Sequence, residues 1–180
     1  FMLSIWPNPC AGGPDYEEFK NAGLMLETDD YYNAFDEDAR KLYWQQAYKN
    51  LYSHGVDAWW CDSSEPLTPE WNHVVRREPG RAYEEYIDTA KERFDCDKMN
   101  EYPFWHAKTL YDGMRQTTSS KRVVNLTRCA YTGQQRLSCV LWSGDISASW
   151  DTFRRQIAAG LNFCASGLPY WTTDIGGFFV

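Results

Sequence analysis

Residues 55–66 read GVDAWWCDSSEP and join a short apolar run to an abrupt group of acidic and hydroxyl side chains. The apolar part, Val56 to Cys61, is rich in aromatic residues and follows a glycine, a combination typical of a buried β-strand. Asp62 and Glu65 come directly after this strand. The stretch therefore predicts a strand that carries carboxylates at its carboxyl end.

Strands and helices are expected to alternate on both sides of this stretch. Short apolar runs predict further strands, and apolar residues at helical spacing predict helices. Buried strands that alternate with amphipathic helices indicate a parallel sheet with both faces covered. The expected strands cover residues 2–6, 122–127 and 137–142, the expected helices cover residues 36–52, 81–94, 102–117 and 150–163, and a loop, PNPCAGGPD, covers residues 7–15.

Length, charge and hydropathy limit the class of protein. The 180 residues correspond to about one domain and contain enough apolar residues to bury a core. The formal net charge is -7 and Lys and Arg form no run, so the surface would repel a nucleic acid backbone. No apolar run approaches the roughly 18 residues of a membrane span. The composition therefore argues against nucleic acid and membrane as partners.

The sequence also lacks the usual motifs for metals and nucleotides. Six Cys lie apart without a C-x-x-C pair and only three His are present, so no zinc site is predicted. Neither a G-x-G-x-x-G loop nor a Walker-type lysine occurs, which disfavours a nucleotide-binding fold. Unpaired thiols are typical of a reducing compartment, so a cytoplasmic location is favoured.

Four charged residues each follow an expected strand: Asp62, Arg128, Asp145 and Asp174. The carboxyl ends of parallel strands share one edge, where barrels and open α/β sheets carry their sites. Two carboxylates facing a glycosidic bond can act as nucleophile and acid. A lone aspartate after a strand often only caps the next helix. Three acids in a chain with 17% aromatic residues favour a catalytic pocket, although aromatic rings also fill cores.

Three segments carry a more specific pattern: GVDAWWCDSSEP (55–66), RCAYTGQQRLSCVLWSGDISASW (128–150) and GLPYWTTDIGGFF (167–179). Together, and in this order, they resemble glycoside hydrolase family 31, a family of retaining α-glycosidases. The resemblance implies an α/β fold, namely a partial (β/α)8 TIM barrel with approximately strands three to seven. Residues 1–180 are then expected to be an internal fragment of a single catalytic domain, with a loop and helix insertion at about 67–100.

The resemblance also implies roles for individual residues. Asp62 matches the nucleophile, and Asp145 matches the general acid/base that protonates the leaving group and then activates water. No metal or organic cofactor is implied. The residues expected to bind the substrate are Trp60, Arg128, Trp142 and Asp174.

Two positions near the expected nucleophile have competing interpretations. Glu65 is an alternative nucleophile to Asp62, but it lies three residues beyond the strand end, where the chain has already turned. A nucleophile needs a rigid element, so Glu65 is expected to support the loop instead. The indole of Trp60 either restricts the pocket to a compact sugar or packs against the neighbouring strand.

The predicted activity is hydrolysis of terminal α-linked xylose or glucose from oligosaccharides or other glycosides, through a covalent glycosyl-aspartate intermediate. The alternatives are a non-catalytic carbohydrate-binding protein and an α-glucan lyase on the same scaffold. The expected partners are an α-glycoside and the remaining barrel strands of a longer chain. A partial barrel exposes sheet edges, so the isolated fragment is expected neither to fold stably nor to turn over substrate.

Overall fold

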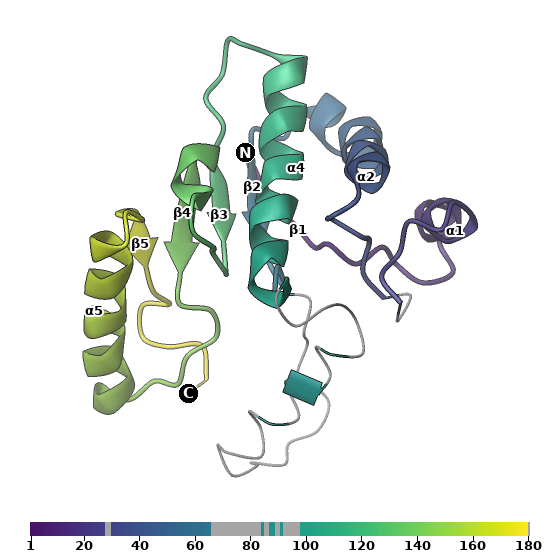
Figure 1. Ribbon diagram of the computed structural model, residues 1–180. Coiled ribbons are helices and arrows are strands. Elements are labelled where there is room, and N and C mark those ends of the chain that lie inside the picture. Colours follow the sequence, from purple (N-terminus) through teal and green to yellow (C-terminus); the bar gives the residue numbers. More distant parts are fainter. Residues whose placement is uncertain (28–29, 66–83, 85–86, 89–90, 92–97, 180) are drawn as a thin grey trace.

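The computed structural model describes residues 1–27, 30–65, 84, 87–88, 91 and 98–179 (Figure 1). The expected insertion at about 67–100 and the expected helix at 81–94 lie largely outside these described residues.

Five parallel strands form one sheet in the described part of the chain, in the order β1-β2-β3-β4-β5. Each strand pairs with the next one in the sequence, without the reversal of order that marks a doubly wound sheet. Such sequential order is that of neighbouring strands in a TIM barrel. The strands are β1 (Met2–Ile5), β2 (Ala58–Cys61), β3 (Asn125–Thr127), β4 (Cys139–Trp142) and β5 (Trp171–Thr172).

Helices connect these strands and confirm the helical segments expected at 36–52, 102–117 and 150–163. Figure 1 shows α5 at the β5 end of the sheet, with α1 and α2 towards the other end. The α-helices are α1 (Pro14–Asn21), α2 (Glu37–Asn50), α4 (Tyr102–Thr117) and α5 (Trp150–Ala165). The short 3-10 helices are η1 (Tyr52–His54), η2 (Met99–Glu101) and η3 (Gln134–Leu137).

The sequence prediction differs from the structure at several places. Strand β2 begins at Ala58, two residues later than expected. Helix α1 is not predicted, because its single buried residue, Phe19, creates no apolar periodicity. Strand β3 begins three residues later than expected. Strand β4 begins two residues later than expected, because η3 precedes it and ends at Ser138, whose φ of 56° is left-handed.

Side-chain oxygens fix the starts of two helices. Asp36 Oδ1 accepts hydrogen bonds from the backbone N–H groups of Asp38 (2.7 Å) and Ala39 (3.1 Å) at the start of α2. Ser149 Oγ accepts one from the N–H of Thr152 (3.1 Å) at the start of α5. Such caps satisfy amides that lack a partner within the helix. They define where each helix begins after the loop that follows its strand.

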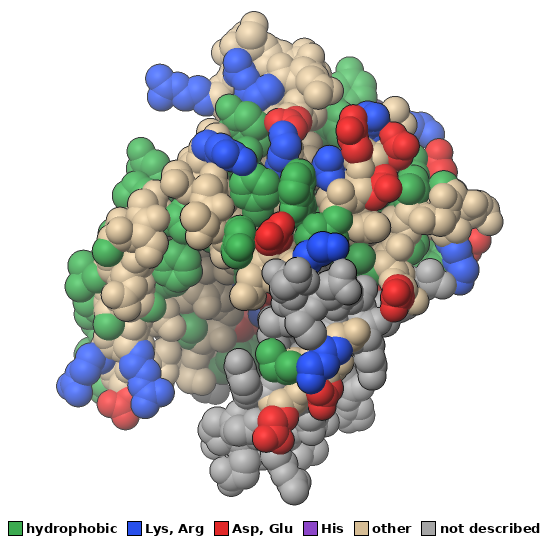
Figure 2. Space-filling view, in the orientation of Figure 1, with side chains coloured by type: hydrophobic (Ala, Val, Ile, Leu, Met, Phe, Trp, Pro, Cys, Tyr) green, Lys and Arg blue, Asp and Glu red, His purple; other side chains and the backbone are tan. Residues whose placement is uncertain are grey.

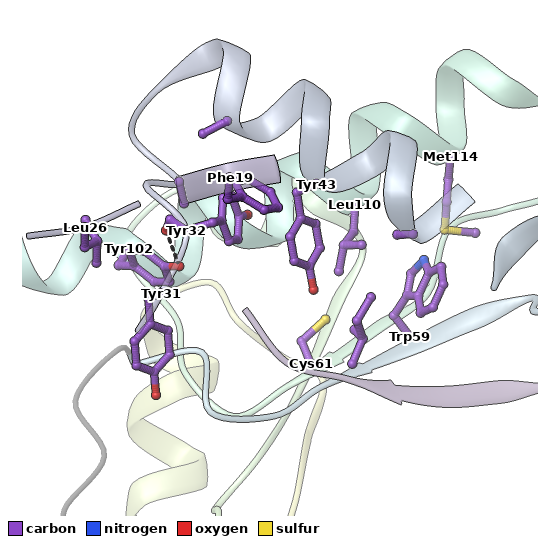
Figure 3. Close-up of a cluster of buried hydrophobic side chains, with 14 of the residues drawn as sticks. Phe19, Leu26, Tyr31, Tyr32, Tyr43, Trp59, Cys61, Tyr102, Leu110 and Met114 are labelled. Atoms are coloured by element: carbon purple, nitrogen blue, oxygen red, sulfur yellow. Dashed lines mark hydrogen bonds between the residues drawn. The ribbon is translucent and has the colours of Figure 1, made fainter. Parts of the chain in front are cut away.

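The main hydrophobic core lies between the helices and one face of the sheet (Figure 3). Trp59 and Cys61 of β2 are fully buried in this core, together with Tyr43 of α2 and Leu110 of α4. Side chains alternate across a strand, so Trp60 points to the opposite face. Consistently, 42% of Trp60 is exposed. The two faces of β2 therefore differ, one packing on helices and the other facing the interior of the curved sheet.

A buried polar network holds the loop between α1 and α2 against α4. The hydroxyl of Tyr32 contacts His106 Nδ1 at 3.0 Å and donates to Thr109 Oγ1 at 3.1 Å. Tyr102 donates its own hydroxyl proton to the backbone oxygen of Tyr32 at 2.9 Å. Burial lowers the pKa of His106 to about 3, so its ring is neutral at physiological pH. The network fixes the position of the neighbouring residue, Tyr31.

Helix α5 exposes a row of large apolar side chains, and hydrophobic atoms are visible over this helix in Figure 2. Their spacing of three to four residues places them along one side of the helix. The row consists of Trp150, Phe153, Ile157 and Leu161. Among the described residues, no helix combines the length and apolar character needed to cross a membrane.

Candidate active site

Asp62 and Arg128 follow neighbouring strands at the same level of the sheet. The backbone N–H of Asp62 donates to the carbonyl oxygen of Ile5 in β1 (3.1 Å), and that of Arg128 donates to the carbonyl oxygen of Cys61 (3.3 Å). These bonds continue the parallel ladders by one residue beyond β2 and β3. Asp62 therefore lies on the same face as Trp60, away from the helix-side core.

The guanidinium group of Arg128 lies among three carboxylates. Its Nη1 is 3.2 Å from Oδ1 of Asp62 and 4.0 Å from Oδ2 of Asp145, and its Nε is 2.9 Å from Oε1 of Glu65. All four side chains are between 16% and 25% exposed, so these charges are partly shielded from solvent. A single cation thus holds two of the predicted catalytic carboxylates close to each other.

Asp145 reaches this group through a tight turn after β4. Gly144, with a φ of 68°, adopts the left-handed conformation that glycine tolerates best. A Cβ atom at this position would lie 3.4 Å from Arg128 Nε, so the turn also passes close to the guanidinium. Burial raises the pKa of Asp145, Arg128 opposes this change, and the negative charges of Asp62 and Asp174 add to it. Asp145 therefore retains a proton more readily than an exposed aspartate.

The segment from Asp62 to Ser64 is held by short contacts. The Ser63 N–H donates to Asp62 Oδ1 at 2.8 Å, and Ser63 adopts a positive φ of 50°. Its hydroxyl lies 3.0 Å from that of Tyr31. The Ser64 hydroxyl lies 3.2 Å from that of Thr127 at the end of β3. An uncommon backbone conformation beside a charged side chain is a frequent feature of functional sites.

Two tryptophans form an aromatic contact beneath the carboxylates. Trp60 and Trp142 meet edge to face, with ring centroids 5.5 Å apart and planes at 86°. Trp142 is 4% exposed, whereas Trp60 is 42% exposed. Trp60 therefore packs on Trp142 from two strands away and still leaves part of its surface open.

A recess of about 440 Å³ lies after the end of β1. None of the three carboxylates around Arg128 lines this recess. One of its lining residues, Trp6, directly follows Ile5, whose carbonyl oxygen accepts the backbone hydrogen bond of Asp62. Aromatic rings with a few polar groups are typical of sugar-binding surfaces. The recess is lined by Trp6, Asn8, Pro9, Cys10, Ala11, Tyr16 and Asp30.

The structure brings the six predicted site residues to one edge and one face of the sheet. Asp62 and Asp145 both lie within 4.0 Å of Arg128, and Asp174 acts on Asp145 through its charge. Trp60 and Trp142 contact each other, as described above. The prediction for Glu65, a supporting role in the loop, omits its ion pair with Arg128. The sequence offers no signal for that pairing beyond the presence of an acid near a strand end.

Metal binding is not indicated by the residues at hand. Over residues 1–27, 30–65 and 98–179, no three His, Cys, Asp or Glu side chains gather in a way that could hold a metal ion. The five cysteines in the described part of the chain are all free thiols.

Comparisons with known proteins agree with this arrangement. The family model described as the glycosyl hydrolases family 31 TIM-barrel domain matches residues 2–179. An alpha-xylosidase of Saccharolobus solfataricus is 40% identical over 98% of this chain and 23% of its own length. The crystal structure of the family 31 alpha-xylosidase from Xanthomonas citri superimposes with a TM-score of 0.84 at 34% identity, over 99% of this chain and 20% of that one.

A second solved structure, a family 31 alpha-xylosidase from a soil metagenome complexed with xylose, has a TM-score of 0.79 at 32% identity, over 98% of this chain and 26% of that one. The chain thus spans 20–26% of these relatives' lengths. The matched domain and the sequential parallel sheet confirm the expected fold class, a partial TIM barrel. This chain belongs to glycoside hydrolase family 31.

Proposed function

We propose that the chain forms the catalytic part of a longer retaining α-glycoside hydrolase that removes terminal α-linked xylose or glucose. The observation that carries the proposal is the pair Asp62 and Asp145, both held by Nη1 of Arg128. Both distances start from the same nitrogen, at 3.2 Å from Asp62 Oδ1 and 4.0 Å from Asp145 Oδ2. The distance between these two oxygens is therefore at most the sum of the two values. Retaining enzymes place their carboxyl groups about 5–5.5 Å apart and inverting enzymes about 6.5–9.5 Å apart, so this limit allows both and retention is inferred from the resemblance to family 31.

The environments of the two acids suit different tasks in a double displacement. Asp145, whose pKa is raised by burial, is the proton donor to the glycosidic oxygen. Asp62 attacks the anomeric carbon as the bond to the leaving oxygen breaks, which forms a glycosyl ester. Asp145, now ionised, then takes a proton from water, and the resulting hydroxide displaces Asp62. The sugar is released with its original configuration, and both acids return to their starting states.

Hydrolysis of p-nitrophenyl α-glycosides by the complete polypeptide tests this function. We expect release of nitrophenol from the xyloside and the glucoside, and much less from the galactoside, with the α-anomer seen first by proton NMR. Xylose is favoured because two similar proteins are named alpha-xylosidases. Sugar binding without turnover would instead identify a carbohydrate-binding protein, and an anhydro product would identify a lyase.

A second prediction concerns the choice between xylose and glucose. Replacing Trp60 with alanine should raise the ratio of glucoside to xyloside kcat/KM by about tenfold, because space beside Trp142 opens for the hydroxymethyl group that xylose lacks. The matched control is Trp150→Ala, which removes an indole that is 84% exposed on α5. An equal loss on both substrates would show that Trp60 packs the barrel without selecting the sugar.

A further inference from the structure

Glu65 is a third carboxylate in the cluster, and both of its oxygens are occupied. Oε1 is 2.9 Å from Arg128 Nε, and Oε2 accepts a hydrogen bond from Cys129 Sγ at 3.1 Å. The two partners are consecutive residues directly after β3. With a side chain only 17% exposed, Glu65 is clamped between the loop that follows β2 and the end of β3.

The contact with Nε determines which way the guanidinium faces. A guanidinium is planar, with its donors in a rigid fork, so a partner at Nε fixes the plane of the whole group. Nη1 then lies 3.2 Å from Asp62 and 4.0 Å from Asp145. An arginine without such a partner favours two parallel bonds to one carboxylate. Glu65 therefore takes the Nε donor away from the catalytic acids, and Arg128 contacts them through Nη1.

Cys129 contributes to this clamp as a neutral donor. Burial raises the pKa of its thiol well above the usual value, and the charge of Glu65 raises it further. The thiol consequently keeps its proton at physiological pH and can donate it to Oε2. A thiol is a weak donor, so its contribution is smaller than that of the ion pair.

We propose that Glu65 is a positioning residue that holds Arg128 midway between Asp62 and Asp145, with Cys129 holding Glu65 in turn. The inference rests on the proposed glycosidase function and assigns Glu65 no contact with the substrate. Its effect is to divide the positive charge of Arg128 between the nucleophile and the acid.

The division of charge predicts a specific change in pH dependence. Asp145 faces Arg128, which lowers its pKa, and Asp62 and Asp174, which raise it. In a Glu65→Gln variant, Arg128 loses its ion pair at Nε and its charge acts more on the two catalytic acids, so the pKa of Asp145 falls. A general acid must be protonated, and activity is lost as pH rises through its pKa. The alkaline limb of kcat/KM should therefore move to lower pH.

The experiment compares wild type, Glu65→Gln and Cys129→Ala in the complete polypeptide, with aryl α-xylosides as substrates. We expect Glu65→Gln to lower kcat by about 10- to 100-fold at neutral pH with KM changed less than about threefold, and to shift the alkaline limb by about half to one pH unit. Cys129→Ala should shift the limb in the same direction by less. The control is Glu37→Gln, which alters an exposed glutamate of α2 that forms an ion pair with Lys41.

Each result has a distinct meaning. A reduced kcat with an unmoved alkaline limb would mean that Glu65 only supports the loop, which overturns the inference. The same holds if Glu65→Gln retains wild-type kcat. If the wild-type protein hydrolyses no α-glycoside, the proposed function fails and this inference fails with it.

Discussion

An Asp62→Ala variant is expected to lose about 10⁵-fold in kcat on every α-glycoside, because no other group can form the covalent intermediate. Asp62 lies on the rigid end of β2 and is held by its backbone bond to Ile5 and by Arg128. Glu65, the competing acid, has both oxygens engaged by Arg128 and Cys129. It therefore cannot replace the missing carboxylate without breaking two contacts.

Two measurements on the complete polypeptide check this result. A 5-fluoro-α-xylosyl fluoride should add one glycosyl mass to the wild-type peptide that contains Asp62 and none to the variant. Azide, a small nucleophile, should restore part of the activity by entering the space of the lost carboxylate, and the product should be the β-glycosyl azide. Asp112→Ala, a change at a half-exposed position of α4, is the control. Labelling of Glu65, or full activity in Asp62→Ala, would contradict the assignment.

The elements that could be predicted from the sequence are those with strong apolar patterns. Strand β2 is predicted because Val56, Ala58, Trp59 and Trp60 form an apolar, aromatic-rich stretch after a glycine. Helix α4 is predicted from the apolar residues Trp105, Leu110, Tyr111 and Met114, and nine residues of the helix are buried. Helix α1 is missed because only Phe19 is buried, so its eight residues lack periodicity. Apolar periodicity therefore does not reveal a helix that packs on the core through a single side chain.

Some features of the candidate site could likewise be predicted from the sequence, and others could not. Asp62, Arg128 and Asp145 could be predicted to converge, because each follows a strand and parallel strands share a carboxyl edge. Which atoms meet there depends on rotamers and on the turn at Gly144, whose left-handed φ places Asp145 near the guanidinium. The contact of Glu65 with Arg128 joins residues on two loops, and no local sequence pattern encodes it.

The raised pKa of Asp145 could not be predicted from the sequence. Composition and spacing show only an aspartate that follows a strand. The raised pKa of Asp145 arises from its burial and from the charges of Asp62 and Asp174, and Arg128 only partly offsets them. These causes depend on the folded geometry, because desolvation and charge interactions act over a few ångströms.

An Asp145→Ala variant is expected to discriminate strongly between leaving groups. On alkyl or sugar leaving groups, which depart only when protonated, kcat/KM should fall by about 10³-fold. On aryl glycosides with acidic phenols, which depart without protonation, it should fall by about tenfold or less. The alkaline limb of the pH profile should also disappear, because in the wild type it reports the loss of the proton whose pKa burial has raised.

Steady-state kinetics across a series of aryl and alkyl α-glycosides measures this discrimination. The second step should become rate-limiting on activated aryl glycosides, because water then lacks its base, so KM should fall together with kcat. Azide needs no base and should speed this step, with the α-glycosyl azide as product, the opposite anomer to that expected from Asp62→Ala. Asp151→Ala, at an exposed position in the first turn of α5, is the control. Equal losses on all leaving groups would remove Asp145 from the acid/base role and leave it only a place in the charge cluster around Arg128.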